Sequence, residues 1–103
     1  MREIKRVSDS IKKNIAMARE DALTAIELKE TFPSIAEAYY KSANSKLNDI
    51  TNYHTAVVGV INDYKKDNGD IPERMKFVYD ILHKENIENV AAIKGILALY
   101  KGN

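Results

Sequence analysis

Helix breakers are scarce in this chain, and their positions constrain its fold more than any other feature does. The sequence contains two Pro and four Gly. Proline disfavours helical geometry in the residue before it, so Pro33 marks a boundary between two helices. Gly69 can close a helix in the left-handed conformation, and Asp70 can cap the next helix ahead of Pro72. The breakers therefore predict three helices, at residues 3–31, 34–68 and 71–101.

Apolar residues recur at helical spacing within each of these three segments. They step by three and four residues, which places them along one face of a helix. The faces consist of Ile4, Val7, Ile11, Ile15, Ala18, Ala22 and Ala25, then Ala36, Tyr40, Ala43, Leu47, Ile50, His54, Val57, Ile61 and Tyr64, and last Met75, Tyr79, Leu82, Asn86, Val90, Ile93, Leu97 and Tyr100. This alternation is typical of long helices in antiparallel bundles. We expect an all-α fold, a single domain over residues 1–103 with three long antiparallel helices.

Composition removes several classes of function. Hydrophobic residues make up 45% of the chain and charged residues 30%, as in ordinary globular proteins. Lys and Arg total 16 against 15 for Asp and Glu, a balance that argues against a nucleic-acid partner. The absence of Cys removes disulfides, zinc knuckles and thiol nucleophiles. No apolar run reaches the roughly 20 residues of a membrane span, and the first residues do not form a signal peptide. We expect a cytoplasmic protein without membrane contact.

Two polar residues, His54 and Asn86, occupy positions on the apolar faces. Folding the chain back at its two breaks places them level with each other, with His83 one turn before Asn86. A buried imidazole or amide needs hydrogen-bond partners, so we predict one buried polar layer formed by His54 and Asn86. The alternative is that His54 serves as a metal ligand or an acid–base group.

Carboxylates decide between these two interpretations of His54. A di-iron bundle directs one Glu from each of two helices, and a Glu-x-x-His motif from each of the other two, toward its centre. Glu20 and Glu27 face away from the apolar face of their helix, and Glu85 and Glu88 also avoid the centre of theirs. Without convergent carboxylates the structural role of His54 is favoured, and we expect no catalytic residues and no cofactor.

Two stretches of sequence resemble a known family. FPSIAEAYYKSANSKLNDITNYH, which begins at Phe32, and the later NDYKKDNGDIPERMKFVYDILHKENIE are similar to a ferritin-like family found largely in phages and prophages. The second helix of that family carries the pattern A-x-x-Y-Y-x-x-A-x-x-E-x-x-H-x-x-x-x-H. The matching positions here are Ala36, Tyr39, Tyr40, Ala43 and His54, followed by the turn from Gly69 to Pro72 and by Tyr79, His83, Ile87 and Glu88. The resemblance implies a ferritin-type bundle.

The chain departs from this family pattern at two metal-ligand positions. Lys46 stands where the family has Glu, and Asp49 stands where it has His. A protonated ammonium cannot ligate a metal and repels a nearby cation. We therefore expect no metal site. A residual site would use Asp49, His54, His83 and Glu88.

A second apolar face is present on the third predicted helix. Phe77, Ile81 and Leu99 lie on the side opposite its main apolar face, and Leu23 lies off the face of the first helix. A long helix with two apolar faces generally has two partners. We predict a homo-oligomer, most simply a dimer, that uses Phe77, Ile81 and Leu99. The alternative is that these residues are scattered surface positions, which are common in proteins.

These observations lead to one expected function and two alternatives. We expect a non-catalytic, ferritin-like helical bundle, encoded by a phage or prophage, that acts through contacts with itself or with a phage or host protein. The first alternative is a metal-binding ferritin-like protein of the di-iron type with an unorthodox site. The second is a small protein that binds nucleic acid or a host factor through the basic residues Arg2, Lys5, Arg6, Lys12 and Lys13.

Overall fold

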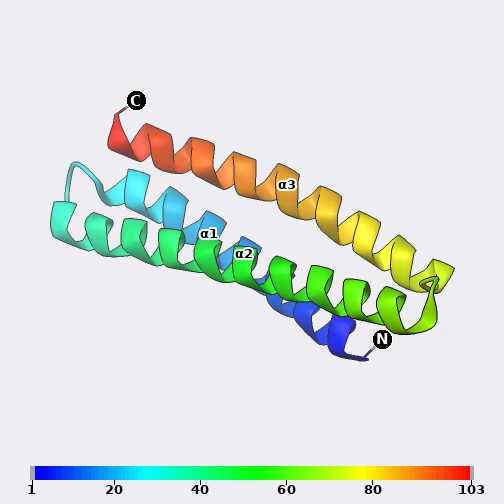
Figure 1. Ribbon diagram of the computed structural model, residues 1–103. Helices are drawn as coiled ribbons and strands as arrows, with labels where there is room; N and C mark the ends of the chain where they lie inside the picture. The colour runs from blue at the N-terminus through cyan, green and yellow to red at the C-terminus, as the bar shows by residue number, and fades with distance from the viewer. Residues whose placement is uncertain (1, 103) are drawn as a thin grey trace.

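The computed structural model describes residues 2–102, and within them the side chains of residues 2–5, 7, 74, 78 and 81 lie outside the description. Across residues 2–102 the chain forms three helices and no strands (Figure 1). The helices are α1 (Arg2–Leu28), α2 (Pro33–Asn68) and α3 (Glu73–Lys101). The predicted all-α fold is confirmed, and both predicted breaks are present.

The turn between α1 and α2 is longer than predicted. α1 ends at Leu28 rather than at residue 31, because residues 29–31 reverse the direction of the chain. The backbone N–H of Phe32 donates to the carbonyl oxygen of Leu28 at 2.8 Å and closes this turn. Pro33 is the first residue of α2, where a missing N–H costs no intrahelical bond.

The turn between α2 and α3 also differs from the prediction. Gly69 has a φ of 85° and its N–H donates to the carbonyl oxygen of Lys65, so a glycine closes α2 as expected. α3 begins at Glu73 rather than at residue 71, because Pro72 is extended (φ −57°, ψ 142°) and disfavours a helix in the residue before it. No side chain caps α3, so the predicted capping by Asp70 is wrong.

The core lies along the three predicted apolar faces. The buried side chains are Ile11, Ile15, Ala18, Ala22, Ala25, Ala36, Ala43, Leu47, Ile50, Val57, Ile61, Met75, Leu82, Ile93, Leu97 and Tyr100. All of them belong to the predicted faces, whereas the predicted Ile4 and Val7 lie outside the described side chains. In the described range, no helix contains an apolar stretch long enough to cross a membrane.

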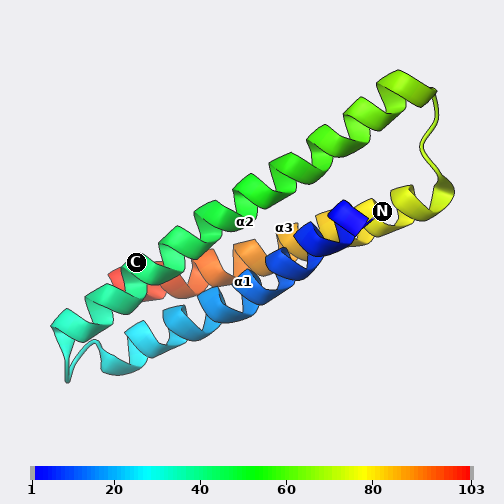
Figure 2. The same cartoon turned by 90° about the horizontal axis from the view of Figure 1, so that it is seen from below.

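Alanine residues bring α1 and α2 close together. Ala18 and Ala22 of α1 and Ala43 of α2 are completely buried in one cluster. Small side chains let helix backbones approach, and α1 and α2 form the most extensive of the three interfaces, whereas α2 and α3 form the least extensive. Figure 1 and Figure 2 together show that α2 and α3 cross at an angle, because they converge toward the turn at residues 69–72 in the first view and diverge toward it in the second. The α2–α3 side of the molecule is therefore the more open one.

The end of the molecule near the first turn is held by Tyr100 of α3. Its hydroxyl donates to Oε2 of Glu37 at 3.0 Å, and its ring stacks on that of Tyr40 with 4.7 Å between centroids. Lys29 Nζ donates to the Tyr100 carbonyl oxygen. These contacts connect α3 to α2 and to the end of α1. Tyr100 therefore fastens the C-terminal end of α3 to the first part of α2.

Candidate functional site: a histidine cluster and an exposed face of α3

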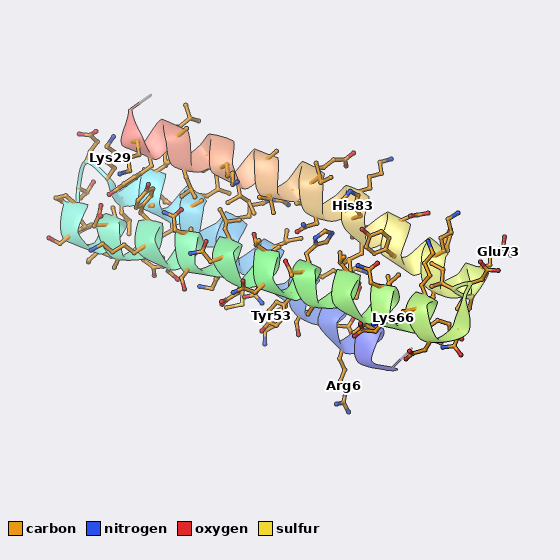
Figure 3. The ribbon with its side chains drawn as sticks, in the orientation of Figure 1. Arg6, Lys29, Tyr53, Lys66, Glu73 and His83 are labelled. Carbon is orange, nitrogen blue, oxygen red and sulfur yellow. The ribbon has the colours of Figure 1, made fainter. Side chains whose placement is uncertain are left out.

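His54 of α2 and His83 of α3 meet between the two helices. In Figure 3 the labelled His83 points from α3 toward α2. Nε2 of His54 lies 3.0 Å from Nδ1 of His83, so one ring donates a hydrogen bond and the other accepts it. The Tyr79 ring stacks beside both, with centroids 5.7 Å from His83 and 6.2 Å from His54. We refer to His54, Tyr79 and His83 as the histidine cluster.

Helical spacing explains how these three residues come together. Tyr79 and His83 are four residues apart and so share one face of α3. His54 follows the buried Ile50 and precedes the buried Val57 on the apolar face of α2. The incline between α2 and α3 leaves the cluster at the edge of the core, where His54 is half-buried and His83 is exposed.

The predicted buried layer of His54 and Asn86 is not what the structure contains. The partner of His54 is His83, and no polar or charged residue among those described is fully buried. Asn86 lies three residues beyond His83 and is therefore rotated about 60° around α3 from it. Its side-chain oxygen is enclosed without a hydrogen-bond partner in the described part of the chain, which leaves an acceptor unsatisfied.

The environment of His54 disfavours its charged form. Partial burial lowers the pKa of the His54 imidazole below its ordinary value of 6.5, and the charge of a protonated His83 lowers this pKa further. No carboxylate forms an ion pair with either ring among the described residues. The His54 ring is therefore expected to be neutral near pH 7, where it shares its hydrogen bond with His83.

The four residues proposed for a residual metal site are not brought together. His54 and His83 meet, but Asp49 and Glu88 are exposed, and each lies five residues from the histidine on its own helix. A separation of five residues turns a side chain about 140° around the helix axis. Among the described side chains, no three of His, Asp or Glu gather into a group that could hold a metal ion.

Lys46, at the position where the ferritin-like pattern has Glu, faces α1 instead of the histidine cluster. Its Nζ donates to Oδ2 of Asp21 at 2.5 Å and to Oγ of Ser42 at 2.6 Å. The Ser42 hydroxyl donates to the same Asp21 oxygen at 2.7 Å. The spacing of residues along the sequence does not pair Asp21 with Lys46. The residues that follow them in the sequence, Ala22 and Leu47, are buried in the same core cluster, so α1 and α2 approach closely at Asp21 and Lys46.

The second apolar face on α3 is exposed. Phe77 and Leu99 are 64% and 66% exposed, and they are the two most exposed large apolar side chains among those described. The side chain of Ile81, the third residue predicted for this face, lies outside the described side chains. Leu23 on α1 is 51% exposed.

Acid is expected to weaken the fold through the histidine cluster. The folded-state pKa of His54 lies below that of the unfolded chain, so the unfolded chain binds the proton more readily. Stability is fully present above the unfolded value of about 6.5 and falls as pH drops from there toward the lower folded value. Urea unfolding between pH 7.5 and 5.5 should show this decline in the wild type and a shallower one in His54→Leu. Parallel pH profiles for the two proteins would contradict this expectation.

Comparison of the chain with protein-family models, curated proteins and solved structures finds no match.

Proposed function

We propose that this protein is a non-catalytic, ferritin-like bundle of three antiparallel helices, encoded by a phage or prophage, that acts through protein–protein contacts and self-associates through α3. The observation that supports this most is the exposure of Phe77 and Leu99 on the side of α3 opposite its buried face. Leaving such side chains in water forfeits the free energy that burial of apolar surface provides. A partner that covers them recovers it.

The accessible surface of the chain is consistent with a partner. A compact monomer of 11.7 kDa is expected to expose about 5,900 Å². The chain exposes 6907 Å², because it is an elongated rod of 56 × 19 × 16 Å. The excess of about 1,000 Å² is comparable to the roughly 800 Å² that each partner buries in a standard interface.

The chemistry of the histidine cluster supports a non-catalytic role. A histidine that acts as a general base is usually oriented by a third polar group and placed beside a nucleophile. His54 and His83 hydrogen-bond to each other, and the remaining member of the cluster is the Tyr79 ring. The cluster therefore joins α2 to α3 without the components of an acid–base site.

Placing a charge on the outer face of α3 should dissociate the protein. Leu99→Glu puts a carboxylate on a surface that must lose water on association, so we expect a shift to monomer in sedimentation at high micromolar concentration. Leu23→Glu is the matched control, because Leu23 is also an exposed leucine but lies on α1. Helicity by circular dichroism should remain in both variants. A wild type that sediments as a monomer at this concentration would refute self-association.

Metal binding is the second candidate function, and the pairing of His54 with His83 favours it. Imidazole nitrogens are common metal ligands, and these two are already adjacent. Elemental analysis of the purified protein distinguishes the two functions. Stoichiometric metal that is retained by the wild type and lost from His54→Leu would favour the second over the first.

A further inference from the structure

A row of exposed residues follows the outer side of α3. Spacings of three, four and seven residues keep them on a stripe of the helix about 80° wide. We call it the outer row, and its described members are Phe77, Lys84, Glu88, Ala92, Gly95 and Leu99, all of which are exposed. Large apolar side chains stand at its two ends, opposite charges near its centre, and small residues between the centre and Leu99. This order has the features of a helix–helix docking surface.

We propose that α3 docks antiparallel on α3 of a second copy of the chain, about a two-fold axis at Glu88. This inference rests on the proposed self-association and specifies its geometry. Glu88 is eleven residues from Phe77 and eleven from Leu99. An antiparallel pair centred there places Phe77 on the partner's Leu99 and Leu99 on the partner's Phe77, so both ends of the row are covered by apolar groups.

The charges near the centre favour the antiparallel direction. Lys84 and Glu88 are exposed, and neither forms an ion pair among the described residues. In the antiparallel pair Lys84 lies one turn from the partner's Glu88, and the two-fold axis repeats the contact on the other side. Both directions bring Glu88 close to the partner's Glu88. In the antiparallel pair a Lys84 from each copy flanks these two carboxylates, whereas a parallel pair in register would also place Lys84 against the partner's Lys84, and this additional repulsion between like charges disfavours it.

The small residues of the row let the two helices approach. Ala92 and Gly95 occupy the stripe between Glu88 and Leu99, and a Cβ built at Gly95 would meet no atom within 4 Å. Lys84 of one copy is level with the partner's Ala92, so the aliphatic part of the lysine side chain can lie over a small residue. The row from Phe77 to Leu99 spans about 33 Å. A helix pair of this length can bury much of the roughly 1,000 Å² by which the exposed surface of the chain exceeds that of a compact monomer.

Engineered disulfides test the direction of the pair, because the chain contains no cysteine of its own. Phe77→Cys and Leu99→Cys are prepared separately, mixed and oxidised. A disulfide needs Cα atoms within roughly 7 Å, and like positions would be about 33 Å apart in the antiparallel pair. We expect the mixed 77–99 crosslink to exceed either like–like crosslink at least tenfold. Predominance of 77–77 and 99–99 crosslinks would overturn the antiparallel arrangement while leaving self-association in place.

Charge reversal tests the same arrangement with both apolar ends intact. Lys84→Glu should raise the dimer dissociation constant about tenfold, because a carboxylate then faces the partner's Glu88. The double variant Lys84→Glu/Glu88→Lys should return to within about threefold of the wild type, measured by sedimentation equilibrium. A wild-type dimer that neither variant alters uses another face and overturns the inference. A wild type that is monomeric refutes the proposed self-association itself.

Discussion

Replacement of Ile50 by Ala is expected to lower the free energy of unfolding by about 2–5 kcal/mol. Ile50 is completely buried and belongs to the main core cluster, to which all three helices contribute. Removing its outer carbons loses the transfer free energy of those atoms and leaves a cavity that rigid helices only partly close. The decrease in the free energy of unfolding should therefore lie in the range measured when buried aliphatic residues of larger domains are replaced by Ala.

Ile35→Ala is the matched control for this substitution. Ile35 lies on the same helix, carries the same side chain and is 50% exposed. Substitutions at exposed positions usually change stability by no more than about 0.5 kcal/mol, so the two variants should be well separated in urea unfolding. Equal losses in the two variants would mean that the core does not lie along the face of α2 that contains Ile50.

Lys46→Glu is expected to lower the free energy of unfolding by about 2 kcal/mol. The side chains of Lys46 and Asp21 are only 19% and 15% exposed, so their ion pair is shielded from water more than a surface pair is. Glutamate at this position loses the hydrogen bonds to Asp21 and Ser42 and places a second carboxylate beside the first. The penalty exceeds that of losing an exposed salt bridge, which is typically below about 1 kcal/mol.

Two further variants separate this interaction from general effects of charge. Lys41→Glu makes the same change at an exposed position of α2 and should alter stability by less than about 0.5 kcal/mol. The double variant Asp21→Lys/Lys46→Glu restores opposite charges and should recover part of the loss, which a double-mutant cycle measures. Strict additivity of the two single variants would show that residues 21 and 46 do not interact.

Lys46→Glu also tests the resemblance to the ferritin-like pattern, because it introduces the residue which that pattern has at this position. The side chain at position 46 contacts α1, whereas the histidine cluster lies between α2 and α3. We therefore expect this variant to gain no stability from added divalent metal. Thermal unfolding with and without metal is the appropriate measurement.

Local properties of the sequence determined the three helices and their buried faces. Pro33 and Gly69 act on their own backbone and their neighbours, so their effect does not depend on the rest of the fold. The spacing of apolar residues determines which face of each helix is buried, and this does not depend on which element packs against that face. For this reason the predicted faces contain all of the buried side chains that the structure describes, although two helix ends were misplaced by two and three residues.

The partners of individual polar side chains were decided only by the tertiary structure. Sequence spacing places His54 near both His83 and Asn86, which differ by about 60° in direction around α3. The rotation and incline of α3 relative to α2 select His83, and they leave the histidine cluster at the edge of the core. The pairing of Lys46 with Asp21 depends in the same way on how closely α1 approaches α2. Periodicity specifies a direction around one helix axis, whereas a contact also requires the position and tilt of the neighbouring axis, which packing of all three helices sets.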